Sequence, residues 1–325
     1  MKRIYSGWKY IWLAGWALLA AACTESDPLQ KRQEETDLAI TLRAGSSSGQ
    51  SRAAIDEGDL FSPLLLCSDR EGDYSTLRWQ ETVRVTEDGV VNYPGQAPVY
   101  PHYGDFIYIT GLHPAPEGGG LTNGTASWRL DGTVDLMYAP QLSGNRWDGF
   151  RIQGNTDASL NKVLQFNHQL TQIRFAAVRQ ANTIGSNEFR ITRITLKAVP
   201  RQASFSVTGT PEDELAVSFS DPADLDVPLL ADPADPGKTV LITSTDPDQP
   251  DAIGSILLPP AEKYIADIET TLGTFLGREV KSEEGNLEKG FAHEIIFHLS
   301  EEGLNITGVQ LEDWMDENGG DVNVN

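Results

Sequence analysis

Two histidines near the C-terminal end come closest to a metal-binding motif in this chain. His293 and His298 lie five residues apart. A zincin helix instead places two histidines four residues apart, so that both project from one helical face. Ile295 and Phe297 predict a strand here, and side chains five residues apart on a strand point to opposite faces. We therefore expect that these two rings cannot share a metal ion.

The remaining candidates for catalysis also lack the context that their chemistry needs. Residues 45–49 read GSSSG, the pattern of a nucleophile elbow, but they begin a Gly/Ser-rich stretch rather than joining a buried strand to a helix. The acidic pairs at 221–226 and 246–251 lack the spacing of a calcium loop. His168 follows Phe166 on a mixed strand pattern, which is more typical of a hydrogen-bonded core histidine than of a base. We predict that the protein is not an enzyme and that it uses no metal and no cofactor.

Composition narrows the classes of partner. The 325 residues carry 25 basic and 47 acidic side chains, a net charge of −22 at pH 7. This balance argues against nucleic acid and against anionic lipid headgroups, both of which need clustered Lys and Arg. Two cysteines exclude a disulfide-rich scaffold and a four-thiolate zinc site. The length suggests about two domains.

Period-2 alternation of apolar and polar residues is the main structural signal. It recurs in short runs separated by turn residues, which favours an all-β protein built of β-sandwiches. The best candidate for a helix is the segment 261–272. Residues 221–237 are rich in proline and acid, and they predict either an interdomain linker or a long loop, since such a segment cannot continue a central strand. We place the domain boundary near residue 200, giving domains 37–200 and 201–325.

The N-terminus has the order of a secretory signal. A positively charged start is followed by the apolar run 11–19 and then by small residues up to Cys23. The run is too short for a stable transmembrane helix. We interpret residues 1–22 as a signal peptide, Cys23 as a lipidated first residue and 23–36 as a polar tether; the alternative is an ordinary signal followed by a chance cysteine. Cys67 then has no partner for a disulfide, and its apolar surroundings predict a buried, inert thiol.

A strand, a linker and an arginine follow the tether in an unusual order. Leu38, Ile40 and Leu42 alternate with polar or small residues, as in a half-buried strand. The Gly/Ser-rich stretch 45–51 comes next and ends at Arg52-Ala53. A flexible exposed stretch of this kind is accessible to proteases.

Short motifs along nearly the whole chain resemble the Bacteroidetes fimbrillin family, which contains the type V pilins and their Mfa-like relatives. Their order carries the resemblance more than any one of them. One departure is Pro260, where relatives commonly have glutamine after Leu-Pro, and it affects only a turn. The matching segments are the lipobox at Cys23, the strand-linker-arginine order ending at Arg52-Ala53, and residues 100–110, 134–139, 163–175, 191–196, 256–260, 308–314 and 321–324.

The resemblance implies two tandem transthyretin-like β-sandwich domains and a lipoprotein, carrying palmitate-type chains on Cys23, that is exported to the outer membrane. In type V pilins an arginine-specific protease removes the N-terminal segment with the first strand. Here this would be cleavage between Arg52 and Ala53, with Arg43 as a second, less accessible site. The vacated groove would take a strand from a neighbouring subunit. Our candidate donor is the segment 308–324, in which Val322 and Val324 alternate with polar residues.

From this resemblance we expect the protein to be a structural subunit or accessory component of a type V fimbrium. It would act in cell adhesion and assemble with like or unlike fimbrial subunits by protease-triggered donor-strand exchange. The alternative is a surface lipoprotein that stays anchored and binds a glycan or a host protein. Exposure of Trp79, Trp128 or Trp147 would favour a glycan, because a free indole face can stack on a sugar, whereas buried indoles are ordinary core.

Overall fold

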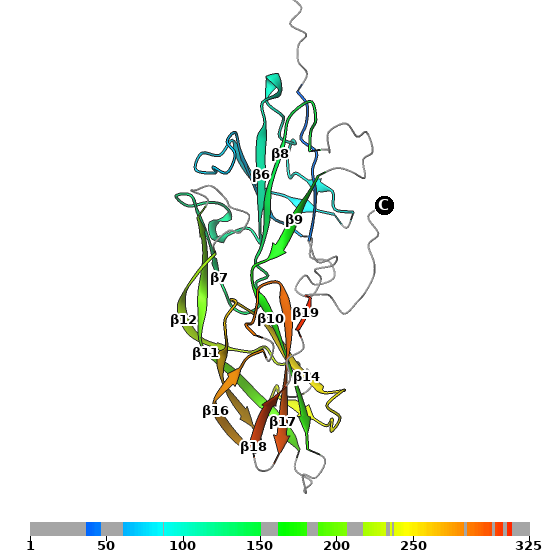
Figure 1. The fold of residues 1–325 in the computed structure, drawn as a ribbon, viewed down its shortest axis with the longest axis vertical. Coiled ribbons are helices and arrows are strands. Elements are labelled where there is room, and N and C mark those ends of the chain that lie inside the picture. Colours follow the sequence, from blue (N-terminus) through cyan, green and yellow to red (C-terminus); the bar gives the residue numbers. More distant parts are fainter. Residues whose placement is uncertain are drawn as a thin grey trace, which may run out of the picture. The chain divides into compact units, whose positions relative to one another are not determined.

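The fold is built almost entirely of β-strands (Figure 1). The computed structural model describes residues 37–46, 61–86, 88–150, 162–180, 188–206, 217–231, 235, 237–282, 285–300, 303–307 and 311–313. The other regular elements in these ranges are two short 3-10 turns, η1 (His102–Gly104) and η2 (Glu117–Gly119). The predicted all-β class is confirmed. No helix in the described ranges is long and apolar enough to span a bilayer.

One six-stranded sheet contains the N-terminal strands, in the order β1-β9-β8-β6-β2-β3. Its pairs are antiparallel except for β1 and β9, which run parallel. A separate small sheet pairs β4 (Arg84–Val85) with β5 (Val91–Asn92). The strands of the six-stranded sheet are β1 (Arg43–Ser46), β2 (Leu64–Ser68), β3 (Trp79–Thr82), β6 (Ile107–His113), β8 (Met137–Gly144) and β9 (Val163–His168).

Two further sheets face each other across a second core. One has the order β14-β10-β17-β18, with β19 also pairing with β17; the other has the order β12-β11-β15-β16, with β7 and β13 also pairing with β11. Their strands are β7 (Thr125–Arg129), β10 (Thr171–Arg179), β11 (Phe189–Ser206), β12 (Ser218–Asp226), β13 (Val240–Ile242), β14 (Asp251–Leu258), β15 (Tyr264–Thr270), β16 (Gly273–Val280), β17 (Phe291–Ser300), β18 (Gly303–Thr307) and β19 (Leu311–Asp313).

Side-chain alternation explains why these segments form sheets with one buried face. In β17, Ile295, Phe297 and Leu299 are buried, and the residues between them are only partly covered. Phe297 meets Phe175 of β10 with ring centroids 5.6 Å apart. The core cluster that contains both rings takes residues from both facing sheets. A period of two residues thus supplies the apolar face that each sheet buries.

Two expectations about segments are corrected. The candidate helix 261–272 contains strand β15, because Tyr264, Ala266 and Ile268 alternate as buried residues in the core. The proline-rich segment begins inside β12, which is a strand rather than a loop up to Asp226. Pro222 is tolerated there because β12 is the last strand of its sheet, where a missing backbone N–H breaks no central ladder.

The tandem division near residue 200 stays a prediction. Residue 200 lies inside β11, which runs from Phe189 to Ser206 with a register shift between Leu196 and Val199. The chain passes from one sheet to another earlier, between His168 and Thr171. In addition, β7 from the first half of the chain pairs with the end of β11. Strand pairing therefore crosses the predicted boundary.

Candidate functional site

The chain from residue 39 to residue 46, here called the first segment, contributes a row of buried side chains. Ile40, Leu42 and Ala44 are buried, whereas Thr41 between them is exposed. The regular strand β1 begins only at Arg43. The predicted strand therefore starts too early: Leu38 is 46% exposed and does not belong to the buried row.

Backbone hydrogen bonds hold the first segment on both sides. On one side, Arg43 to Ser46 pair in parallel with residues 163–166 of β9. On the other side, the Ile40 N–H donates to the carbonyl of Pro98 (2.7 Å), and the Ala44 N–H donates to the carbonyl of Gly89 (2.9 Å). The first segment is thus an inserted strand, and its removal would leave two unpaired edges.

The buried row covers the core of the six-stranded sheet. Ile40 and Leu42 together stabilise the docked segment by about 3–6 kcal/mol, at the usual value for burying each side chain. Removing the segment would expose this apolar surface as a groove of strand width. The other buried members of the cluster are Leu65, Cys67, Val83, Val85, Val91, Tyr100, Ile107, Ile109, Met137, Ala139, Phe150, Leu164 and Phe166.

Gly89 approaches the first segment so closely that a side chain at this position would meet its backbone. Its φ is +74°, and a Cβ at this position would lie 2.9 Å from the carbonyl oxygen of Ala44. Gly89→Ala should destabilise the protein by about 1–3 kcal/mol, because the left-handed backbone and this contact both oppose a side chain. Urea unfolding measures the loss. Gly95→Ala is the control, since nothing lies within 4 Å of a Cβ there, and equal losses in both variants would contradict the close approach.

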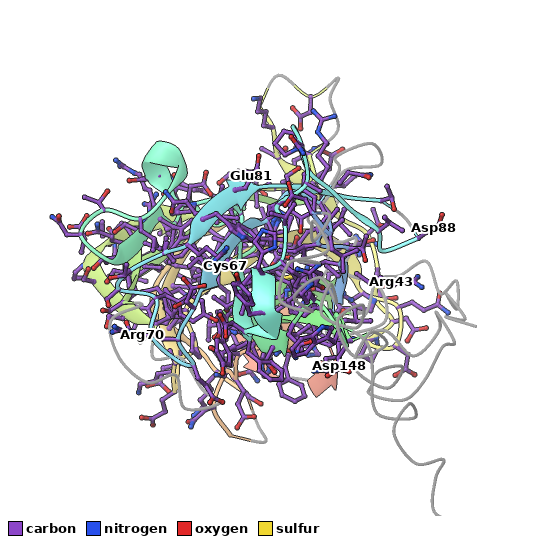
Figure 2. All side chains as sticks on the ribbon, turned by 90° about the horizontal axis from the view of Figure 1, so that it is seen from above. Arg43, Cys67, Arg70, Glu81, Asp88 and Asp148 are labelled. Carbon is purple, nitrogen blue, oxygen red and sulfur yellow. The ribbon has the colours of Figure 1, made fainter. Side chains whose placement is uncertain are left out.

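The two arginines considered for proteolysis differ in setting. Arg43 lies in β1, and its Nη2 donates to the backbone carbonyl of Asp88 (2.6 Å). Figure 2 shows Arg43 and Asp88 near one another at the margin of the protein. A residue paired within a sheet is a poor substrate for a protease. Arg52, Ala53 and the lipidation site Cys23 lie outside the described residues.

The candidate donor segment is described only in part. Val322 and Val324 lie outside the described residues. Leu311–Asp313 of the same segment form β19, which pairs antiparallel with residues 291–293 of β17. This part of the predicted donor is therefore already paired within its own chain.

The sites considered for metal and acid-base chemistry are structural. His293 is fully buried and its neighbour in the motif, His298, is only partly covered, so the two rings point to opposite faces of β17. Burial lowers the pKa of His293. No group of three or more metal-ligating side chains occurs among the described residues. The predicted absence of a shared metal at this pair follows from the strand geometry.

A second group of titratable residues consists of His113 at the end of β6, His168 at the end of β9 and Asp135 just before β8. His168 Nδ1 and Asp135 Oδ1 are 2.8 Å apart, and both side chains are buried. His168 is thus the hydrogen-bonded core histidine that its pattern predicted. Close to this pair, burial lowers the pKa of His113 to about 4. His168, Asp135 and His113 thus form a polar cluster in the interior.

Cys67 is chemically inert, as predicted. Its side chain is fully buried in β2, and burial raises the pKa of the thiol to about 12. A thiol with so high a pKa is almost never the reactive thiolate at neutral pH. Figure 2 shows Cys67 among densely packed side chains.

The three tryptophans have different exposures. Trp128 is buried, and its Nε1–H donates to the carbonyl of Pro114 (2.9 Å). Trp79 is partly covered and meets Tyr93 edge to face, with centroids 6.3 Å apart. Trp147 is 73% exposed. Sequence reasoning missed Tyr103, which is also exposed, and the backbone contacts of Gly89 and Pro98 with the first segment. The Asp-Gly dipeptide at 88–89 indicates a turn, but it does not indicate which strand that turn contacts.

One family model matches this chain. The model of the fimbrillin-like family matches residues 77–314. A comparison with curated protein sequences finds no significant match.

Solved structures share the fold. A candidate cell adhesion protein from Bacteroides uniformis is 12% identical with a TM-score of 0.56, over 86% of this chain and 99% of that one. A second candidate cell adhesion protein, from Bacteroides ovatus, is 16% identical with a TM-score of 0.54, over 87% of this chain and 99% of that one. A fimbrial protein from Bacteroides vulgatus is 14% identical with a TM-score of 0.52, over 85% and 99%. Because the family model spans most of the sequence, the chain belongs to the fimbrillin-like family.

Proposed function

We propose that the protein is a structural subunit or accessory component of a fimbrium and that it assembles by exchanging its first segment for a strand of a neighbouring subunit. The observation that carries this proposal is the setting of the first segment. Its apolar row is buried, and its backbone is bonded on both sides. A strand of this kind leaves a groove that combines unpaired backbone groups with apolar pockets, which is the surface that β-augmentation requires.

Proteolysis next to Arg52 is the proposed trigger. The first segment is joined to the rest of the chain through residues 47–60, and this linker keeps the segment at a high effective concentration next to its groove. Cleavage between Arg52 and Ala53 would remove the tether. Cleavage at Arg43 is disfavoured, since its backbone pairs with β9 and its side chain bonds to Asp88.

The segment 308–324 is the proposed donor. Val322 and Val324 alternate with polar residues, so they would enter successive pockets of a groove. In the described part of this segment, β19 pairs with β17 through three residue pairs, so its release would cost less than a full ladder in a neighbour's groove would return. The first segment occupies the groove with Ile40, Leu42 and Ala44, so we expect valine side chains, which lie within this range of sizes, to fit the same pockets.

Anchoring precedes assembly in this proposal. Acylation of Cys23 with palmitate-type chains would hold the precursor at the outer membrane, because more than one acyl chain is needed for stable binding. Cleavage at Arg52 would release the subunit from this anchor together with the first segment. The mature protein would then be part of a cell-surface fimbrium.

The test is trypsin-like proteolysis of the parent and of Arg52→Ala. We expect the parent to be cut before Ala53 and to form polymers, whereas Arg52→Ala stays a full-length monomer. Arg43→Ala is the matched control and should polymerise like the parent. Size-exclusion chromatography and N-terminal sequencing of the products measure both results.

Two outcomes would contradict the proposal. Equal amounts of polymer from Arg52→Ala and the parent would exclude Arg52 as the trigger. A parent that stays monomeric after clean cleavage before Ala53 would instead favour the second function, a surface lipoprotein that binds a ligand. The exposure of Trp147 is the observation that keeps this second function in view.

A further inference from the structure

Two loops meet where β6 begins and β8 ends. The turn η1 precedes β6, and a tight turn at 145–149 follows β8. Ile107 of β6 pairs with Gly144 of β8, which brings the two loops together. Two contacts join them directly. Arg146 Nη1 donates to His102 Nδ1 (3.2 Å), and the Trp147 ring lies against Gly104.

Three exposed aromatic side chains, here called the aromatic platform, lie on these loops. Trp147 is 73% exposed, Tyr103 72% and Phe106 48%. The other large apolar side chains that are exposed in the described ranges are aliphatic. Exposed aromatic surface is thus concentrated at this one place in the described part of the chain.

The turn that carries Trp147 is held to the protein body, and the indole lies against Gly104. The backbone N–H groups of Trp147 and Asp148 both donate to Asn145 Oδ1, each at 2.9 Å. Asn145 is buried, so this turn is anchored to the protein body. The indole occupies the space where Gly104 would carry a Cβ, and Gly104 has a φ of +73°. Little freedom is left to lose when a ligand covers the free face of the ring.

Tyr103 has a strained backbone that keeps its ring outward. Its φ is +70°, a conformation that residues other than glycine rarely adopt. Such strain costs about 1–3 kcal/mol and is concentrated at functional sites. The fold therefore maintains a solvent-exposed tyrosine, at a cost in stability, on the loop that Trp147 contacts through Gly104.

The same two loops carry charged and polar side chains next to the platform. Arg146 and His102 form the contact between the loops, and Asp105 and Asp148 lie beside the rings in sequence. Guanidinium donors and carboxylate acceptors are the groups that bind hydroxyls, and aromatic faces carry a negative quadrupole that attracts weakly positive C–H groups. A sugar ring offers both at once, hydroxyls at its edge and C–H groups on its face.

We propose that the aromatic platform binds a neutral oligosaccharide. A net charge of −22 opposes an anionic polymer. A partner protein would need roughly 20–30 residues on this side, whereas the platform consists of three rings and their polar rim. The proposal does not depend on strand exchange, because every residue in it lies in the uncleaved protein and outside the first segment.

Titration of the uncleaved chain with chitohexaose and mannohexaose, both neutral, tests the proposal. We expect at least one of them to bind by calorimetry and to shift tryptophan emission to the blue, and we expect the anionic hexagalacturonate not to bind. Trp147→Ala should weaken binding about tenfold, and Trp147→Phe should retain part of the affinity. Circular dichroism should be unchanged in both variants, since the Trp147 ring is mainly exposed.

Leu276→Ala is the matched control, because Leu276 is a similarly exposed side chain on β16. It should bind like the parent. Failure of both neutral sugars to bind at millimolar concentration would overturn the proposal, as would equal weakening by Leu276→Ala. Self-association of the parent that Trp147→Ala abolishes would also overturn it, by assigning the platform to a second copy of the chain. None of these results depends on cleavage at Arg52.

Discussion

Replacing Ile40 by aspartate is expected to release the first segment from its groove without any proteolysis. Ile40 is fully buried in the core beneath the six-stranded sheet. An uncompensated buried charge costs about 3–5 kcal/mol. This cost is close to the roughly 3–6 kcal/mol that burial of Ile40 and Leu42 contributes to docking of the segment. The charge should therefore offset most of the docking energy and open the segment, while the second core stays intact.

Amide hydrogen exchange measures this release. The N–H groups of Ile40, Ala44 and Val91 are the donors of the hydrogen bonds that hold the segment. All three should therefore lose protection from exchange together. Thr41→Asp is the matched control, because it adds the same charge one residue later on the exposed face. If both variants keep the protection of the parent, the apolar row does not determine docking.

The folded state should lose stability as the pH falls from about 6.5 to about 4, because of His113. Burial lowers the pKa of this side chain from 6.5 to about 4, against the opposing effect of the nearby Asp135 carboxylate. The unfolded chain therefore binds a proton in this range that the folded chain does not. Above the unfolded pKa of 6.5 the folded state has its full free energy of unfolding, and part of it is lost as the pH falls toward the folded pKa of about 4. The magnitude of this loss is on the order of 3 kcal/mol.

Urea unfolding at pH 7 and pH 4.5 measures this effect. His113→Gln cannot take up a proton, so its free energy of unfolding should fall less than that of the parent between the two values. His102→Gln, in an exposed loop, is the control and should behave like the parent. The buried His168–Asp135 pair is retained in both variants. A fall in His113→Gln as steep as in the parent would contradict the assignment to His113.

Local periodicity accounts for the part of the fold that could be predicted. Alternating residues such as Ile295 and Phe297 predict a strand because a period of two residues puts both on one face. The same period of two residues separates His293 from His298, because residues five apart on a strand lie on opposite faces. Reasoning from local periodicity failed at 261–272, where the spacing of the residues imitates a helix but strand β15 forms. It also failed at Pro222, because the position of β12 at the edge of its sheet is set by strand order and cannot be seen in the residues.

The sequence by itself determined the all-β class, the lack of a catalytic constellation, and the resemblance that the family match confirms. Each depends on residue types and spacings within short stretches. The tertiary structure alone decided that Gly89 and Pro98 bond to one side of the first segment and β9 to the other, that β19 pairs with β17, and that Trp147 is exposed whereas Trp128 is buried. The physical reason is that a strand pattern fixes which side chains share a face, while the partner that covers that face comes from contacts between residues far apart in the chain.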